Sequence, residues 1–154
     1  MSQLPMLSHL RSAADRDFRI TFETCAVAPA DFGHEAHVRL AYVYLAELGV
    51  ESAVERMRQA LLAFLEHNNI PRSKFHETLT RSWILAVRHF MNRSSSVSAS
   101  DFIAKNPELL DSKIMFTHYS ASVLFSAEAR ERYVEPDLDP IPHQAGQSAG
   151  KNAT

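Results

Sequence analysis

The chain has 154 residues, of which 45% are hydrophobic and 22% charged, and a formal net charge of −2 with neutral histidines. This length suits one domain with its own core, and the weak charge disfavours nucleic acid or an anionic membrane as a partner. The single cysteine, Cys25, excludes an intramolecular disulfide and a cysteine-based zinc cluster. Since no apolar run reaches the ~18 residues of a membrane span and the first residues lack a signal-peptide core, we expect a cytoplasmic protein.

The first thirty residues are predicted to form an N-terminal arm that packs on the rest of the chain. The stretch MLSHLRSAADRDF is compatible with a short helix. The stretch FRITFET alternates like a strand, but a lone strand has no partner to pair with. The alternative is a partly disordered leader.

Residues 31–134 carry apolar side chains at helical spacing and are predicted to form an all-α, single-domain bundle of about four main helices. The first three helices are expected at about 31–48, 52–67 and 73–90. Their connections are only a few residues long, which makes neighbouring helices antiparallel. The first and third helices therefore run in the same sense, and both begin at the end of the bundle where the second one finishes.

Local signals mark the ends of these helices and the shorter elements that follow. Gly49 is expected to end the first helix as a left-handed cap, and Ser52 with Glu55 forms the pattern of a capping box for the second. After the polar linker 92–100, Ser98 or Asp101 caps a fourth, shorter helix. Further helical turns are expected after Asn106-Pro107 and at roughly 121–133, and residues 135–154 are predicted to be an extended, disordered tail.

Three histidines should converge at the shared end of the first and third helices. His34 and His37 are three residues apart and share one helix face, and His76 begins the third helix. Imidazole is a common ligand of divalent transition metals, so these rings are candidate ligands of a mononuclear site with an open position. Without sulfur ligands, iron or zinc is favoured over copper or nickel, and His118 is a candidate for an additional ligand. The alternative is that each histidine only satisfies a neighbouring backbone group.

Two glutamates follow the histidines directly in sequence. Glu35 and Glu77 are candidates for a catalytic general base beside a metal-bound water. The alternative is that each only forms a helical ion pair, with Arg39 and Arg81 respectively. Three further side chains on these helices are expected to line a substrate pocket above the histidines: Tyr42, Thr80 and Trp83.

Several familiar catalytic patterns are missing from the sequence. The His-Glu-x-x-His helix of zinc metalloproteases does not occur, because His37 comes one position too early and Thr80 stands where the second histidine would be. The Glu-x-x-His pattern of ferritin-like di-iron proteins is also absent. The low glycine content, four residues in all, argues against a dinucleotide-binding or P-loop fold.

The Phe-x-His-x-x-His helix start at 32–37, the His-Glu-Thr start at 76–78 and the closing Pro-Asp-Leu segment resemble a group of small bacterial all-helical proteins. The resemblance spans roughly residues 31–142 and carries no activity with it. It implies a compact helical fold and assigns no role to any residue.

Two functions follow from these patterns. The first is a small metal-dependent enzyme that acts on a small molecule, by an oxidative reaction if the metal is iron or by hydrolysis or hydration if it is zinc. The second is a non-catalytic helical binding or regulatory module, as a monomer or a homodimer, in which the histidines are structural.

Overall fold

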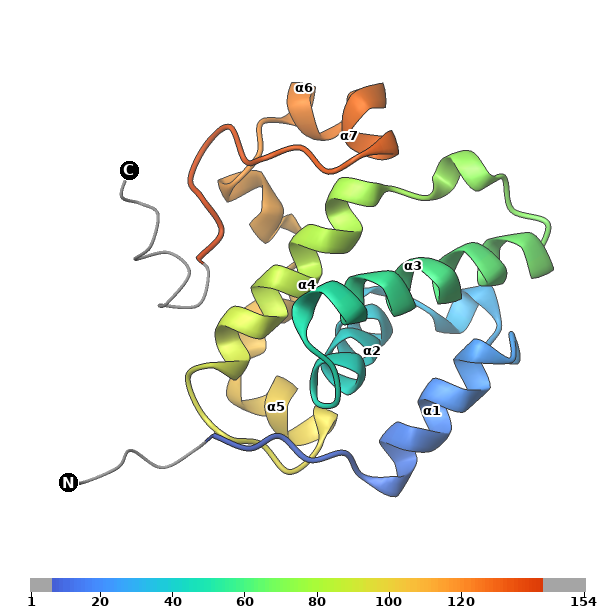
Figure 1. Cartoon of the computed structure of the whole chain (residues 1–154), viewed down its shortest axis with the longest axis vertical. Helices are drawn as coiled ribbons and strands as arrows, with labels where there is room; N and C mark the ends of the chain where they lie inside the picture. The colour runs from blue at the N-terminus through green and yellow to red at the C-terminus, as the bar shows by residue number, and fades with distance from the viewer. Residues whose placement is uncertain (1–6, 143–154) are drawn as a thin grey trace.

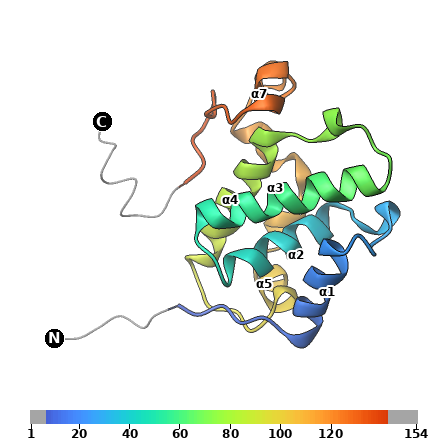
Figure 2. The same cartoon turned by 45° about the vertical axis from the view of Figure 1, so that its right-hand side comes forward.

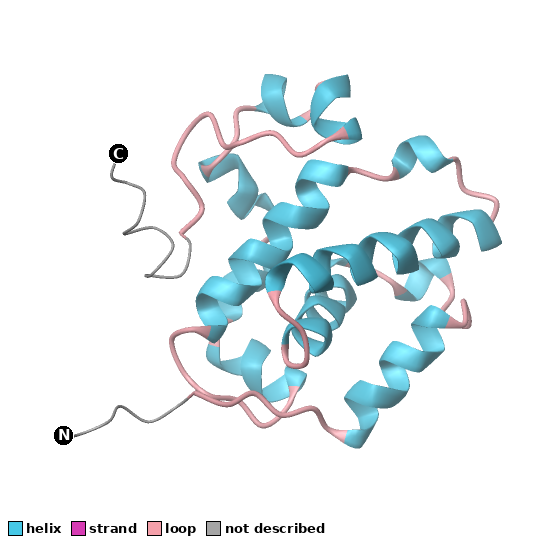
Figure 3. Ribbon diagram, in the orientation of Figure 1, coloured by secondary structure: helices cyan, strands magenta, loops and turns pink. Residues whose placement is uncertain are grey.

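The computed structural model describes residues 7–142, which form helices joined by turns (Figures 1 and 3). The helices are α1 (Ala13–Glu23), α2 (His34–Leu45), α3 (Val50–His67), α4 (Glu77–Met91), α5 (Ala99–Lys105), α6 (Ala121–Leu124) and α7 (Ala127–Glu131). Four 3₁₀ turns lie between them: η1 (Pro29–Asp31), η2 (Arg72–Lys74), η3 (Pro107–Leu110) and η4 (Ser112–Thr117). The all-α, single-domain prediction is therefore confirmed. No helix within the described residues is long and apolar enough to cross a bilayer.

Helices α2, α3 and α4 form the centre of the molecule. Figure 2 shows α2 and α3 running side by side in opposite senses, with α4 packed across both. The α2 stretch from Leu40 to Leu45 is buried on every face, because α1, α3, α4 and α5 surround it. This central helix belongs to a single core that also receives Phe22 from α1 and Phe102 from α5.

The N-terminal arm contains a full helix, α1, whose start is tied to two other parts of the chain. The Asp15 carboxylate accepts hydrogen bonds from the backbone N–H of Ser12 at 3.1 Å and of Ala99 at 2.9 Å, and it pairs with Arg39 at 3.3 Å. Burial alone would raise the pKa of Asp15, but these bonds and the Arg39 charge outweigh it and hold the pKa below its usual range. The arm is thus anchored by a buried charge as well as by Phe22. The alternation of FRITFET belongs to this helix and not to a strand.

The turn between α2 and α3 differs from its prediction. Gly49 has φ −73° and is the N-cap of α3, so it is not a left-handed end to α2. The helix begins at Val50, which places Ser52 inside the first turn and not at the cap. The connection from Leu45 to Val50 is short, as the sequence pattern indicated, and it leaves α2 and α3 antiparallel.

From Pro107 onward the chain forms only short helical turns that wrap over α2 and α4. The predicted cap Ser98 is confirmed at the start of α5, where its hydroxyl accepts a hydrogen bond from the Asp101 N–H. Between α7 and residue 142 the chain forms no helix, and Ile141 in this segment is only 2% exposed and belongs to the core. The remainder of the predicted tail, residues 143–154, lies outside the described part of the chain.

Candidate functional site

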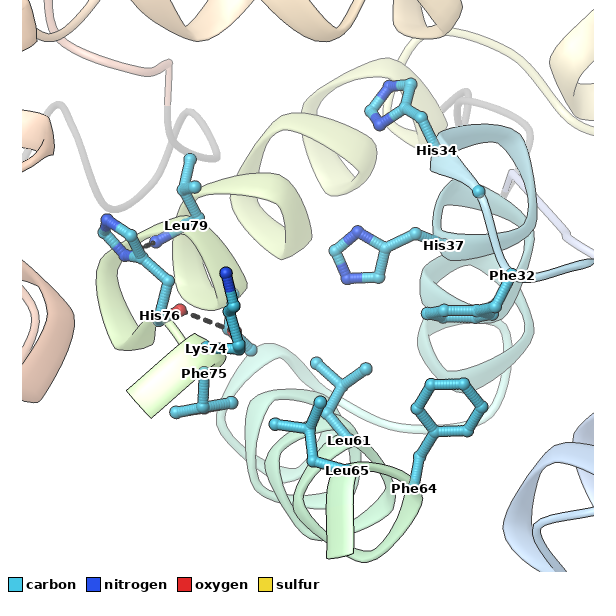
Figure 4. Close-up of a pocket in the computed structure, with 12 residues that line it drawn as sticks. Phe32, His34, His37, Leu61, Phe64, Leu65, Lys74, Phe75, His76 and Leu79 are labelled. Carbon is cyan, nitrogen blue, oxygen red and sulfur yellow. Dashed lines mark hydrogen bonds between the residues drawn. The ribbon is translucent and has the colours of Figure 1, made fainter. Parts of the chain in front are cut away.

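A cavity of about 350 Å³ lies where the N-terminal turns of α2 and α4 meet the C-terminal half of α3 (Figure 4). This is the convergence of helix ends that the short connections predicted. The volume is near the lower end of the ~300–1,000 Å³ typical of small-molecule sites. Six apolar side chains form most of the wall: Phe32, Leu61, Phe64, Leu65, Phe75 and Leu79. The polar side chains of the lining are His34, His37, Lys74, His76 and Thr80.

The apolar wall is held in place by stacked aromatic rings. Phe32, just before α2, stacks on Phe22 of α1 at 4.4 Å between ring centroids, and Phe22 stacks on Phe64 of α3 at 5.0 Å. Phe22 is fully buried behind this wall. One side of the cavity therefore rests on the core.

His76 is a structural residue with no free nitrogen. Its Nδ1 accepts the Leu79 N–H at 3.1 Å and so caps α4, while its Nε2–H donates to the Leu124 carbonyl at 2.7 Å. Because Leu79 N–H only donates and the Leu124 carbonyl only accepts, these two bonds establish the tautomer. Burial lowers the pKa of His76, with a further contribution from the Arg130 charge, so the ring is held neutral.

His34 makes a similar bond from the other helix. Its Nε2–H donates to the Leu109 carbonyl of η3 at 2.8 Å, and its ring meets Trp83 edge-on at 4.5 Å. Trp83 is 5% exposed and belongs to the core, so it supports the histidine from behind. His34 thus ties the start of α2 to the C-terminal segment.

His37 is the exception among the three histidines. Its ring projects from α2 toward the space between α3 and α4 (Figure 4), and its buried Nε2 has no hydrogen-bond partner. The Phe32 ring packs against the His37 ring, with 5.9 Å between the ring centroids. Burial, with a smaller contribution from the charge of His34, lowers the pKa of His37 to about 4, so the ring is neutral at pH 7.

The proposed fourth ligand lies elsewhere. The Nδ1–H of His118 donates to the Asp139 carbonyl at 2.7 Å, in the segment that follows α7, and His118 does not line the cavity. Across residues 7–142, no group of three or more His, Cys, Asp or Glu side chains is placed so that it could hold a metal ion. The three-histidine site therefore remains a prediction, and the hydrogen bonds of His76 leave that ring no lone pair for a metal.

The two glutamates proposed as bases point away from the cavity. Both oxygens of Glu77 are bound by Arg58 of α3, at 2.9 and 2.5 Å. Glu35 is exposed and lines a separate, more polar cavity beside α1. Neither side chain faces His37 across the apolar cavity.

The predicted helical ion pairs were wrong. Arg39 pairs with Asp15 and not with Glu35, and Arg81 pairs with Glu51 of α3 and not with Glu77. In each case the arginine finds a carboxylate on a neighbouring helix. Of the predicted pocket residues, Thr80 lines the cavity and donates its hydroxyl to the His76 carbonyl, whereas the Tyr42 hydroxyl donates to the Leu10 carbonyl on the far side of α2.

Sequence analysis did not identify the α3 wall or Lys74 as part of the site. The run LLAFL at residues 61–65 places apolar residues on more than one face of α3, and Leu61 and Leu65 line the cavity. That second apolar face was the available signal, whereas nothing near Lys74 in the sequence marks it.

Comparisons of the chain with protein-family models, with curated proteins and with solved structures give no match.

The two bonds of His76 lead to a prediction about stability. We expect His76→Ala to lower the free energy of unfolding by about 2–4 kcal/mol, since it removes the α4 cap and leaves the Leu124 carbonyl without its donor. His76→Asn should recover about 1 kcal/mol, because asparagine is a good N-cap but is too short to reach Leu124. Urea denaturation measures both, with the exposed His67→Ala as the control. A wild-type stability for His76→Ala would contradict the assignment.

The environment of His37 leads to a prediction about pH. In the unfolded chain the ring takes up a proton near pH 6.5, whereas the folded chain resists protonation down to about pH 4. The neutral ring therefore contributes fully to stability above pH 6.5, and this contribution is lost as the pH falls toward 4. Between pH 7 and 4.5 the wild type should lose about 2–3 kcal/mol more than His37→Gln. Urea denaturation at both pH values tests this. The control, His67→Gln, should lose as much unfolding free energy between the two pH values as the wild type does. Equal losses in wild type and His37→Gln would contradict it.

Proposed function

We propose that this protein is a non-catalytic binding module, whose small and mainly apolar ligand occupies the cavity between α2, α3 and α4. The observation that carries the proposal is the buried Nε2 of His37, which lacks a hydrogen-bond partner within a mainly apolar wall. A buried polar atom without a hydrogen bond costs about 1–3 kcal/mol. A ligand group that bonds to it would recover part of that cost.

The roles of the other polar groups support binding over catalysis. His76 and Thr80 form hydrogen bonds with backbone groups, and Glu77 is bound to Arg58. The cavity lining contains no aspartate, glutamate, serine or cysteine. His37 is thus left without the acidic or nucleophilic partner that general acid–base or covalent catalysis requires.

A neutral probe tests the proposal. We expect 1-octanol to bind with an affinity of roughly micromolar to millimolar Kd, since its chain can occupy the apolar wall and its hydroxyl can bond to His37. Leu61→Trp fills the cavity and should weaken binding at least tenfold. Leu62→Trp is the matched control, because Leu62 is the next residue of α3 and lines a different cavity. NMR titration of the backbone amides measures both. Absence of binding, or equal binding by Leu61→Trp, would contradict the proposal.

A metal-dependent enzyme is the second candidate. Two imidazoles that lie close together on one face of α2 favour this candidate. The charge of His34 lowers the pKa of His37, and the Nε2 of His37 has no hydrogen-bond partner. An iron or zinc ion held by these two rings would have open positions for water or a small substrate. His76 would join only by giving up its cap on α4.

Elemental analysis separates the two candidates. Protein purified without a histidine tag should carry stoichiometric iron or zinc if the second candidate is right, and His37→Ala should remove it. For the binding module we expect less than about 0.1 metal ion per chain after supplementation, and the same 1-octanol affinity before and after chelation. His118→Ala is the control, since that ring bonds only to the segment after α7.

A further inference from the structure

The cavity has a single lining residue that carries a full charge at neutral pH. Lys74 ends η2, immediately before α4, and it is exposed at the cavity rim. In Figure 4 it lies beside His76 and Leu79, on the side of the cavity opposite the His37 ring. The Lys74 ammonium has no hydrogen bond or ion pair with any residue of the described chain.

No carboxylate faces Lys74 from the cavity. Of the nearby glutamates, Glu77 is bound by Arg58, and Glu35 lines the separate cavity beside α1. The arginines of α2, α3 and α4 all have partners, as in the pairs of Arg56 with Glu23 and Arg81 with Glu51. The rim of this cavity is therefore positive and uncompensated, while its interior is apolar.

Resting on the proposed function, we propose that the ligand is an apolar monocarboxylate. Its alkyl or aryl part lies against Phe32, Leu61, Phe64 and Leu65, and its carboxylate lies at the rim, paired with the Lys74 ammonium. The exposure of Lys74 keeps one side of the carboxylate in water, which avoids the large cost of burying an ion.

Three eight-carbon probes that differ only in their head group test this charge preference: octanoate, 1-octanol and octylammonium at pH 7. We expect octanoate to bind roughly five- to tenfold more tightly than 1-octanol, and octylammonium to bind most weakly. The advantage of octanoate should shrink with added salt, because Lys74 is exposed. Isothermal calorimetry or NMR titration gives the three affinities.

Variants of Lys74 assign the preference to one residue. Lys74→Met keeps the apolar stem and should remove the advantage of octanoate over 1-octanol. Lys74→Arg should retain the advantage. Lys113→Met is the control, since Lys113 is an exposed lysine of η4 outside the cavity, and it should behave as wild type.

The outcomes separate this inference from the function on which it rests. Equal binding of octanoate and 1-octanol, tighter binding of octylammonium, or an undiminished advantage in Lys74→Met would overturn the carboxylate ligand and leave the binding module standing. If none of the three probes binds, both proposals fail together. If all three bind Leu61→Trp as well as wild type, the ligand site lies elsewhere and both are again overturned.

Discussion

Two imidazole rings hold the last third of the described chain against the helical core. After Pro107 the chain makes only short turns, which leaves many backbone carbonyls without the partner that a long helix would provide. His34 and His76 each donate a hydrogen bond to one of these carbonyls, at Leu109 and Leu124. Because one ring sits at the start of α2 and the other at the start of α4, the same two bonds position both helix ends that border the cavity.

This constraint distinguishes three histidines that are similar in sequence. A neutral imidazole has one N–H and one lone pair. His76 uses both in the folded chain, and His34 uses its N–H, whereas the buried Nε2 of His37 has no partner. The chemistry of the cavity therefore depends mainly on His37, the ring whose buried Nε2 has no hydrogen bond in the folded chain. A low pKa at such a site reflects burial in an apolar wall and keeps the ring uncharged.

The architecture could be predicted because it depends on local signals. Helical periodicity located α2, α3 and α4 to within a few residues, and their short connections predicted which ends would meet. The ion pairs could not be predicted in this way. Spacing of four residues allowed Arg39 to pair with Glu35, yet Asp15 on another helix binds it instead, since a buried carboxylate gains more from a cation than an exposed one does.

The site was only half predictable for a related reason. The direction of the helices predicts which residues approach the cavity. The hydrogen bonds of each histidine ring, in contrast, depend on residues that are distant in the sequence. The acceptors of His34 and His76 lie 75 and 48 residues later, on turns that carry no periodic pattern. The charge of the rim also depends on distant contacts, since Glu77, three residues after Lys74, is bound by Arg58 from the middle of α3. Hydrogen bonds and ion pairs to neighbouring segments therefore determine which polar side chains of the cavity are already bonded. The side chains that stay unpaired determine what kind of ligand the cavity favours.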